Sequence, residues 1–257
     1  MAMNFVGKSL ALSTSGFSDA VLALNTKAPE VWSVLAVETR GSGFQSNRKP
    51  KILFERHIFS RLTGGQFDAS HSGISSPIRG GYGADGDHQY DRLAEALALN
   101  EDAALKSASW GLAQIMGENF AAAGFANVQD MVQAMVTSED LQMTAFGKFL
   151  LSKRLDRALA IHDWTTFARG YNGPNFAENH YDTQLQGFFL KFSTGPLPDL
   201  DVRTAQVYLT FQGFDPHGID GVMGPSTRSA LIEFQQSVQL PTTGVPDAAT
   251  LAKLAPN

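Results

Sequence analysis

One acidic residue, Glu38, stands at the end of an apolar stripe. Val31, Val34 and Leu35 precede it by seven, four and three positions, which is the spacing of one helical face. A carboxyl group that continues such a stripe loses hydration, and this loss raises its pKa. A carboxyl that stays protonated near neutral pH can act as a general acid. The alternative is an ordinary exposed Glu at a helix end, and the stripe alone favours that alternative.

Helical periodicity dominates the segments that must position this acid. Residues 15–40 predict two short helices around Asn25, and Pro29 suits the first turn of the second. Helical spacing resumes after Gly86 and continues to about Phe192. Within this region Ser138 is a good N-cap, and the acids that follow it suit a first helical turn.

Two segments between these helices have a different character. The apolar run Ile52–Phe54 predicts a short strand, so we expect at most a small sheet near residues 41–60. Residues 63–86 are rich in Gly, Ser and Asp and predict a long surface loop, a type of segment that often binds ligands. A further short helix is expected from Asp163 to Gly170.

A change in composition near residue 194 divides the chain. We predict a first domain at residues 1–193, a Pro- and Gly-containing linker at 194–200 and a small second domain at 201–257. Three short helices are expected in the second domain, at about 201–212, 226–238 and 248–254. The fold class is therefore mainly α, with a small β region in the first domain and a three-helix C-terminal module.

Composition excludes several functions. The chain of 257 residues has a net charge of −5, which gives no basic surface for nucleic acid. It has no Cys, and its six His are scattered without metal-ligand spacing, so we expect neither a metal nor a cofactor. No apolar run is long enough for membrane insertion, and the N-terminus is a poor signal peptide. We expect a monomer made in the cytoplasm.

Three short segments resemble the signatures of the lysozyme-like superfamily. They are Glu38–Phe44 (ETRGSGF), Ser109–Met116 (SWGLAQIM) and Arg169–Pro174 (RGYNGP). In this order they are similar to the E-[ST] acid, the G-L-x-Q-I-M turn and helix start, and the Y-N-x-G turn of goose-type lysozymes and soluble lytic transglycosylases. Those enzymes cut the glycan strands of peptidoglycan.

A closer resemblance covers residues 15–193. With Lys49–Phe59 (KPKILFERHIF), the three segments resemble the phage-type N-acetylmuramidase family of endolysins. This resemblance implies an α-rich lysozyme-like fold, with a small β-hairpin region and with Glu38 as the catalytic acid. Thr39 and Ala113 stand where lytic transglycosylases usually have Ser and Met, which favours a muramidase.

The resemblance also implies further site residues, each with an alternative. Gln114 is expected to bind a sugar hydroxyl or N-acetyl group, or else to be a capping amide. Tyr171 and Asn172 are expected in a Gly-flanked turn at the substrate, although Asn172 could instead satisfy the turn itself. Glu55 is a candidate for the second carboxylate that glycosidases need, and its alternative role is a buried partner of a neighbouring arginine, Arg56 or Arg61. If no carboxylate lies within reach, the substrate's own groups would take this second role.

The C-terminal segment Asp220–Leu231 (DGVMGPSTRSAL) resembles the signature of the three-helix peptidoglycan-binding domain. Peptidoglycan is thus the expected partner of both domains, and a tethered module would raise local concentration at an insoluble polymer. On this view, deleting residues 196–257 should weaken binding to sacculi and leave activity on soluble glycan fragments.

These features predict an endolysin-type hydrolase that cuts β-1,4 bonds between N-acetylmuramic acid and N-acetylglucosamine, with Glu38 as general acid. It would act on the wall in the periplasm after release through a pore or by lysis. Two alternatives stay open: a lytic transglycosylase that forms 1,6-anhydro products, and a catalytically silent wall-binding protein.

Overall fold

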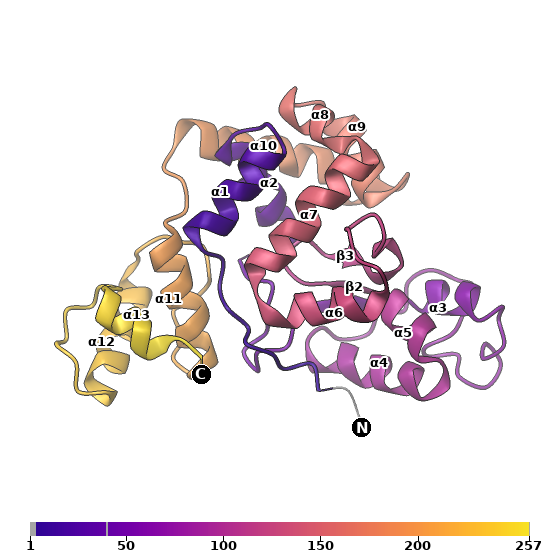
Figure 1. Ribbon diagram of the computed structural model, residues 1–257, viewed down its shortest axis with the longest axis horizontal. Helices are drawn as coiled ribbons and strands as arrows, with labels where there is room; N and C mark the ends of the chain where they lie inside the picture. The colour runs from indigo at the N-terminus through magenta and orange to yellow at the C-terminus, as the bar shows by residue number, and fades with distance from the viewer. Residues whose placement is uncertain (1–3, 40, 257) are drawn as a thin grey trace.

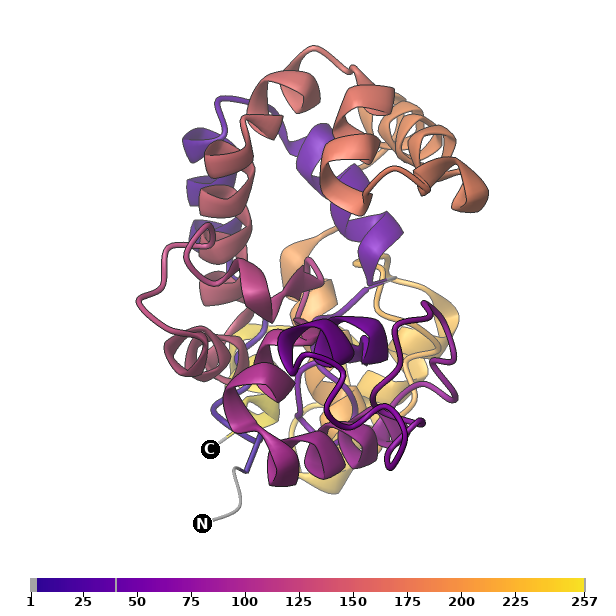
Figure 2. The same ribbon diagram turned by 90° about the vertical axis from the view of Figure 1, so that its right-hand side faces the viewer.

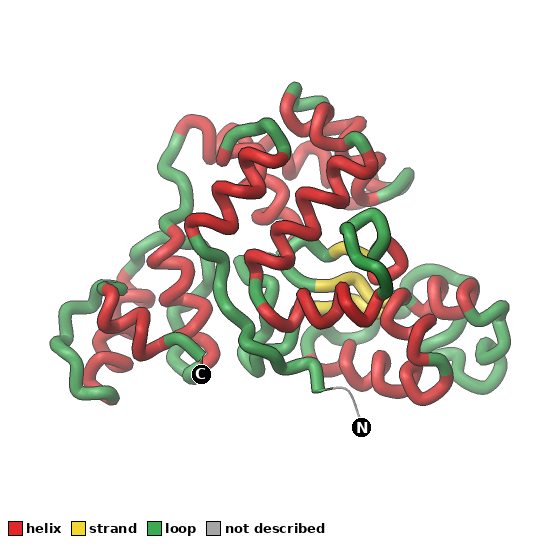
Figure 3. Tube along the Cα trace, in the orientation of Figure 1, coloured by secondary structure: helices red, strands yellow, loops and turns green. Residues whose placement is uncertain are grey.

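The computed structural model describes residues 4–39 and 41–256, which fold around two separate hydrophobic cores (Figure 1). The larger core belongs to the segment that ends with α10 (Tyr181–Thr194), and the smaller one to the C-terminal helices. Helices account for most of the chain, and strands are few and short (Figure 3). The predicted mainly α fold is confirmed. No helix in the described part of the chain is long and apolar enough to cross a membrane.

One half of the larger domain, called here the helical lobe, consists only of helices. They are α1 (Thr14–Ala23), α2 (Ala28–Glu38), α7 (Glu139–Lys153), α8 (Leu155–Ala160), α9 (Trp164–Asn172), the 3₁₀ helix η2 (Phe176–Asn179) and α10. Helix α2 packs along α10, and α1 packs along α7. As predicted, Ser138 caps α7, because its hydroxyl accepts a hydrogen bond from the N–H of Leu141.

The other half, the sheet lobe, surrounds a small antiparallel sheet of order β1-β2-β3. Its elements are β1 (Ile52–Phe54), α3 (Arg56–Leu62), α4 (Asp87–Leu99), α5 (Glu101–Lys106), β2 (Ala108–Trp110), β3 (Ile115–Met116), the 3₁₀ helix η1 (Gly117–Asn119) and α6 (Val128–Thr137). The predicted strand at Ile52–Phe54 is confirmed, with Leu53 opposite Ser109.

The expected helix start within Ser109–Met116 was wrong. These residues form the β2–β3 hairpin instead, in which Trp110 pairs with Ile115 and both side chains are buried. The tight turn is made by Gly111 and Gln114, whose positive φ angles of 71° and 47° reverse the chain. Two strands of the sheet therefore come from outside the expected region 41–60.

The long loop at residues 63–86 is confirmed, and hydrogen bonds from the sheet lobe hold it in place. The buried guanidinium of Arg92 in α4 donates hydrogen bonds to the carbonyls of Gly73 and Tyr82 in the loop and of Phe54 in β1. Asp68 accepts hydrogen bonds from two serines, Ser60 and Ser75. These hydrogen bonds hold the loop against the sheet lobe.

The C-terminal module contains α11 (Leu200–Phe211), α12 (Pro225–Ser237) and α13 (Ala248–Leu254), each within one residue of its predicted bounds. Its core joins Leu209, Leu231, Phe234 and Leu254. Helix α10 ends at Thr194 and α11 begins at Leu200, so the non-helical connection is residues 195–199. Figure 1 shows the N-terminal segment running between this module and α7.

Helix α2 connects the two lobes. Val31, Val34 and Leu35 are buried as the stripe predicted, and Pro29 lies in the first turn. Figure 2 shows α2 descending from the helical lobe toward the sheet lobe, so the last residue of α2 lies where the lobes meet. That residue is Glu38.

Candidate active site

Glu38 is the last residue of α2, and its side chain is only partly exposed. Burial raises the pKa of Glu38 to about 7, although a hydrogen bond from Tyr181 acts in the opposite direction. The direction and the cause agree with the expectation from the apolar stripe. Near neutral pH a substantial fraction of Glu38 therefore carries a proton that it can donate.

Two tyrosines face this carboxyl group. The hydroxyl of Tyr181, at the start of α10, donates a hydrogen bond to Oε1 of Glu38. The rings of Tyr171 and Tyr181 are stacked with centroids 6.4 Å apart. Burial, reinforced by the charge of Glu38, raises the pKa of both tyrosines well above 10, so both remain neutral and act only as hydrogen-bonding and apolar groups.

Tyr181 was not predicted as a site residue. In the sequence it is one member of an amphipathic stripe with Leu185, Phe188 and Phe192, and nothing in that stripe separates it from a core aromatic. Its partner Glu38 lies 143 positions earlier. Only the packing of α10 along α2 brings the two groups together.

The three segments that resemble the superfamily signatures meet around this centre. The hydroxyl of Tyr171 donates a hydrogen bond of 2.5 Å to the carbonyl of Ala113 in the β2–β3 hairpin. The backbone of Gly43 passes so close to Leu112 that a Cβ on Gly43 would lie 2.7 Å from the Leu112 nitrogen. The segment after Glu38, the hairpin and the end of α9 are therefore in direct contact.

Gln114 holds the hairpin together. Its side-chain amide donates to the carbonyls of Lys51 (3.1 Å) and Gly111 (2.8 Å), and its oxygen accepts a hydrogen bond from Ser109. Both amide hydrogens are thus used within the protein. This is the capping alternative considered above, and substrate binding by Gln114 stays a prediction.

Tyr171 and Asn172 lie in the last turn of α9, not in the Gly-flanked turn that we expected. The helix continues past Gly170 and ends at Asn172, and the C-cap residue Gly173 has a positive φ of 86°, a conformation that favours glycine. Asn172 is exposed, and its side chain makes no hydrogen bond to residues 4–39 or 41–256. Its amide is available to a ligand, whereas the hydroxyl of Tyr171 already has a protein partner.

Glu55 is the N-cap residue of α3 in the sheet lobe. Its Oε2 lies 3.0 Å from Nδ1 of His57, so a histidine lies beside Glu55 at the place where the alternative role put Arg56 or Arg61. Arg61 pairs with Glu118 instead. Burial lowers the pKa of His57, although Glu55 acts in the opposite direction. The role of Glu55 as a second carboxylate stays a prediction.

The chemistry available here is that of a proton donor. Glu38 offers a carboxyl group with a pKa near 7, in a position fixed by a tyrosine and at the junction of two lobes. Among the described residues, no group of three or more His, Asp and Glu side chains is arranged to hold a metal ion.

The chain is similar to known proteins in two separate parts. Residues 27–193 match the N-acetylmuramidase family, and residues 198–254 match a peptidoglycan binding domain family. Among solved structures, the crystal structure of the Burkholderia AP3 phage endolysin is similar, with 37% sequence identity and a TM-score of 0.65. The similarity covers 72% of this chain and 71% of that endolysin. No curated protein matches the chain.

Proposed function

Because the chain belongs to the N-acetylmuramidase family, we propose that it cleaves the β-1,4 bond between N-acetylmuramic acid and N-acetylglucosamine with Glu38 as general acid. The chain is a peptidoglycan hydrolase of the lysozyme-like glycoside hydrolases. The observation that carries the assignment of Glu38 is its pKa of about 7, which keeps a transferable proton on a carboxyl group at neutral pH.

Glu38 transfers this proton to the glycosidic oxygen as the bond from that oxygen to C1 of N-acetylmuramic acid breaks. The electron pair of the bond stays on the oxygen, which becomes the 4-hydroxyl of N-acetylglucosamine. Positive charge develops at C1, and a water oxygen adds there and loses a proton to a base. Tyr181 occupies Oε1 of Glu38, which leaves Oε2 to carry the proton toward the substrate.

Glu55 is our candidate for the base that activates this water. Its Oε2 has no hydrogen-bond partner of good geometry among the described residues, and the neighbouring His57 lies at ion-pair distance. Because burial lowers the pKa of His57 from its usual value of 6.5, this histidine is mostly neutral at neutral pH and places no full positive charge beside Glu55. Glu55 would then accept the proton from the attacking water.

Substrate contacts are proposed for Asn172, Tyr171 and Gln114. The exposed amide of Asn172 suits a sugar hydroxyl or N-acetyl group. The partly exposed ring of Tyr171 offers an apolar surface next to Glu38. The C-terminal module would hold the enzyme on the polymer while these groups act.

The test is the chemistry of the products. Purified sacculi are digested, and the released muropeptides are examined by mass spectrometry. Hydrolysis gives hydrated reducing ends on N-acetylmuramic acid, as proposed, whereas 1,6-anhydro ends would identify a lytic transglycosylase and refute the hydrolytic step.

The role of Glu38 is tested by Glu38→Gln, which keeps the shape and the hydrogen bond from Tyr181 but cannot donate a carboxyl proton. We expect clearing of sacculi to fall by roughly 10²–10⁴-fold. Glu101→Gln, at an exposed position in the first turn of α5, is the matched control and should clear normally. Clearing by Glu38→Gln at the wild-type rate would remove Glu38 as the acid, and a wild type without any clearing would favour the wall-binding alternative.

A further inference from the structure

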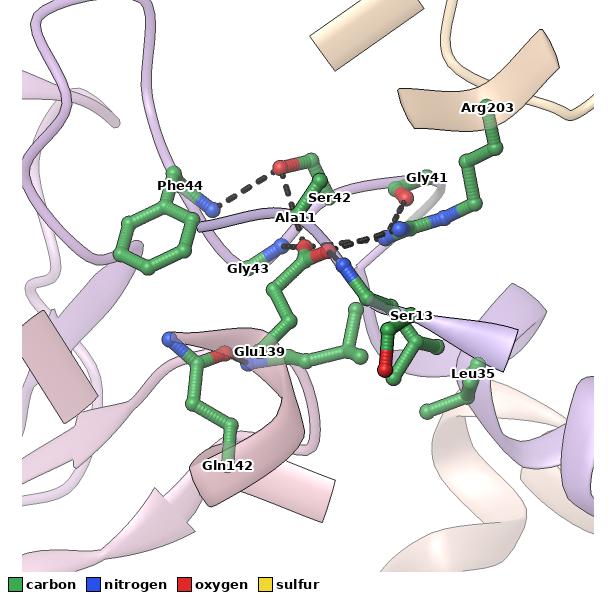
Figure 4. A network of polar contacts seen from close by, with 12 residues as sticks. Ala11, Ser13, Leu35, Gly41, Ser42, Gly43, Phe44, Glu139, Gln142 and Arg203 are labelled. Atoms are coloured by element: carbon green, nitrogen blue, oxygen red, sulfur yellow. Dashed lines mark hydrogen bonds and ion pairs between the residues drawn. The ribbon is translucent and has the colours of Figure 1, made fainter. Parts of the chain in front are cut away.

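A buried ion pair joins the C-terminal module to the catalytic domain. Arg203 in α11 donates to Glu139, the first residue of α7, through Nη1 (2.6 Å) and Nη2 (2.9 Å) (Figure 4). The two side chains are only 2% and 0% exposed. Burial by itself would raise the pKa of Glu139, but Arg203 and two backbone N–H groups lower it overall, so the carboxylate is ionised.

The same pair holds the loop that follows Glu38. Nη2 of Arg203 donates to the carbonyl of Gly41 (2.6 Å), and Oε1 of Glu139 accepts the N–H of Gly43 (2.7 Å). Figure 4 shows both side chains reaching this loop from opposite domains. Gly41 is the third residue after Glu38. The module therefore contributes a hydrogen bond to the loop that directly follows the catalytic acid.

The module also abuts this loop directly. A Cβ on Gly41 would lie 2.2 Å from the carbonyl oxygen of Ile219 in the module, and the φ of Gly41 is 134°. On the N-terminal segment, the N–H of Ala11 donates to the hydroxyl of Tyr208 in α11 (3.0 Å). The N–H of Leu12 donates to Glu139 (2.7 Å). Three parts of the chain therefore converge on one ion pair.

Next to these contacts, side chains do not completely fill the interface between the catalytic domain and the C-terminal module. A cavity of about 460 Å³ lies between α2, α10 and the module. Its apolar lining includes Leu35, Phe188, Phe192, Ile219 and Val222. The polar network therefore lies beside an unfilled cavity, and together with the edge-on contact between the rings of Phe44 and Phe211 it joins the loop to the module.

We propose that Arg203 is a positioning residue of the active site, through which the C-terminal module sets the loop after Glu38 and thereby the place of the acid. The inference rests on the proposed role of Glu38. It differs from the simple tether expected from the sequence, in which the module could be lost without effect on soluble fragments. The two domains are instead parts of one catalytic unit.

The test uses the full chain with substitutions at the ion pair. Arg203→Met leaves Glu139 buried without its partner, so it can unfold the protein. The double variant Glu139→Met/Arg203→Met replaces the pair with apolar side chains, a change that is often tolerated, and still lacks the bonds to Gly41 and Gly43. Arg203→Lys keeps the charge but not the fork that reaches both groups.

Activity is measured on soluble uncross-linked glycan strands, for which attachment to the wall plays no part. We expect folded variants to lose roughly tenfold to a hundredfold in kcat, as for a misplaced catalytic group, with little change in KM. The alkaline limb of the pH profile should also move to lower pH, because a loosened loop admits water to Glu38. A merely structural role would change stability without moving this limb.

Arg228→Met, at an exposed position in α12, is the matched control and should keep the wild-type kcat and pH profile. A folded double variant with wild-type kcat and an unmoved limb would overturn the inference. If both methionine variants unfold, the same two measurements on Arg203→Lys decide. Glu38→Gln is assayed in parallel: activity there would refute the proposed function, whereas an inactive Glu38→Gln beside normal Arg203 variants would refute only the positioning role.

Discussion

The hydrogen bond from Tyr181 to Glu38 tunes the proton affinity of the acid, and Tyr181→Phe removes this bond while keeping the ring. The bond favours the ionised carboxylate, so it lowers the pKa of Glu38 from the higher value that burial alone would give. Its loss should therefore raise that pKa above about 7.

The size of the change follows from the difference between two hydrogen bonds. A bond to a charged group contributes about 1.5–3 kcal/mol and one to a neutral group about 0.5–1.5 kcal/mol. Taking the middle of each range, the ionised form loses about 1.25 kcal/mol more than the protonated form, which corresponds to roughly one pH unit. Activity requires protonated Glu38, so it falls as pH rises through this pKa. The alkaline limb of kcat/KM should move up by about one pH unit in the variant.

The assay is kcat/KM against pH on soluble glycan strands. Tyr171→Phe is the control, because it removes a hydroxyl from the adjacent stacked ring that bonds to Ala113 and not to Glu38. Tyr171→Phe can change the rate, but the alkaline limb of its kcat/KM profile should stay at the wild-type pH. An unmoved limb in Tyr181→Phe, or one moved to lower pH, would refute the reasoning.

Two further substitutions have defined outcomes. The pKa of Glu38 is higher in the folded chain than its usual value of 4.5, so its ionisation destabilises the fold as pH rises from about 4.5 to 7. Allowing for partial exposure, Glu38→Gln should be more stable than wild type by about 2 kcal/mol at pH 8, with no gain at pH 4, in denaturant unfolding. Gln114→Leu should lose about 1–3 kcal/mol in the same experiment, because it removes the amide hydrogen bonds to the carbonyls of Lys51 and Gly111 and leaves the Ser109 hydroxyl without its acceptor. Unchanged stability with a raised KM would instead support substrate binding by Gln114.

Local patterns predicted the elements well. The stripe that leads to Glu38, the cap at Ser138 and the three helices of the module depend on residues within a few positions of one another. Such signals can be recognised in short stretches of sequence, and the structure contains the elements that they predict. The stripe also allowed a raised pKa for Glu38, but by itself it favoured an ordinary exposed Glu, and the packing of α10 along α2 decides in favour of the raised pKa.

Contacts between distant segments could not be predicted. Glu139 lies in the first turn of α7, where an acidic residue is favoured by the helix dipole. This local role explains the residue in the sequence, so nothing there indicates a distant partner. In the structure it is the buried partner of Arg203, 64 positions away. The β2–β3 hairpin was missed because two short strands have too few residues to show alternation, and their pairing depends on a turn at Gly111 and Gln114.

The ion pair between Glu139 and Arg203 restricts how the parts of this enzyme can be exchanged. A chimera that joins the catalytic domain to a foreign wall-binding module would leave Glu139 charged and enclosed, unless the new module supplied an arginine at the same place. A donor module should therefore be chosen by its side chain opposite Glu139, or Glu139 should be changed to an apolar residue first. Linker length would be a secondary choice in such designs.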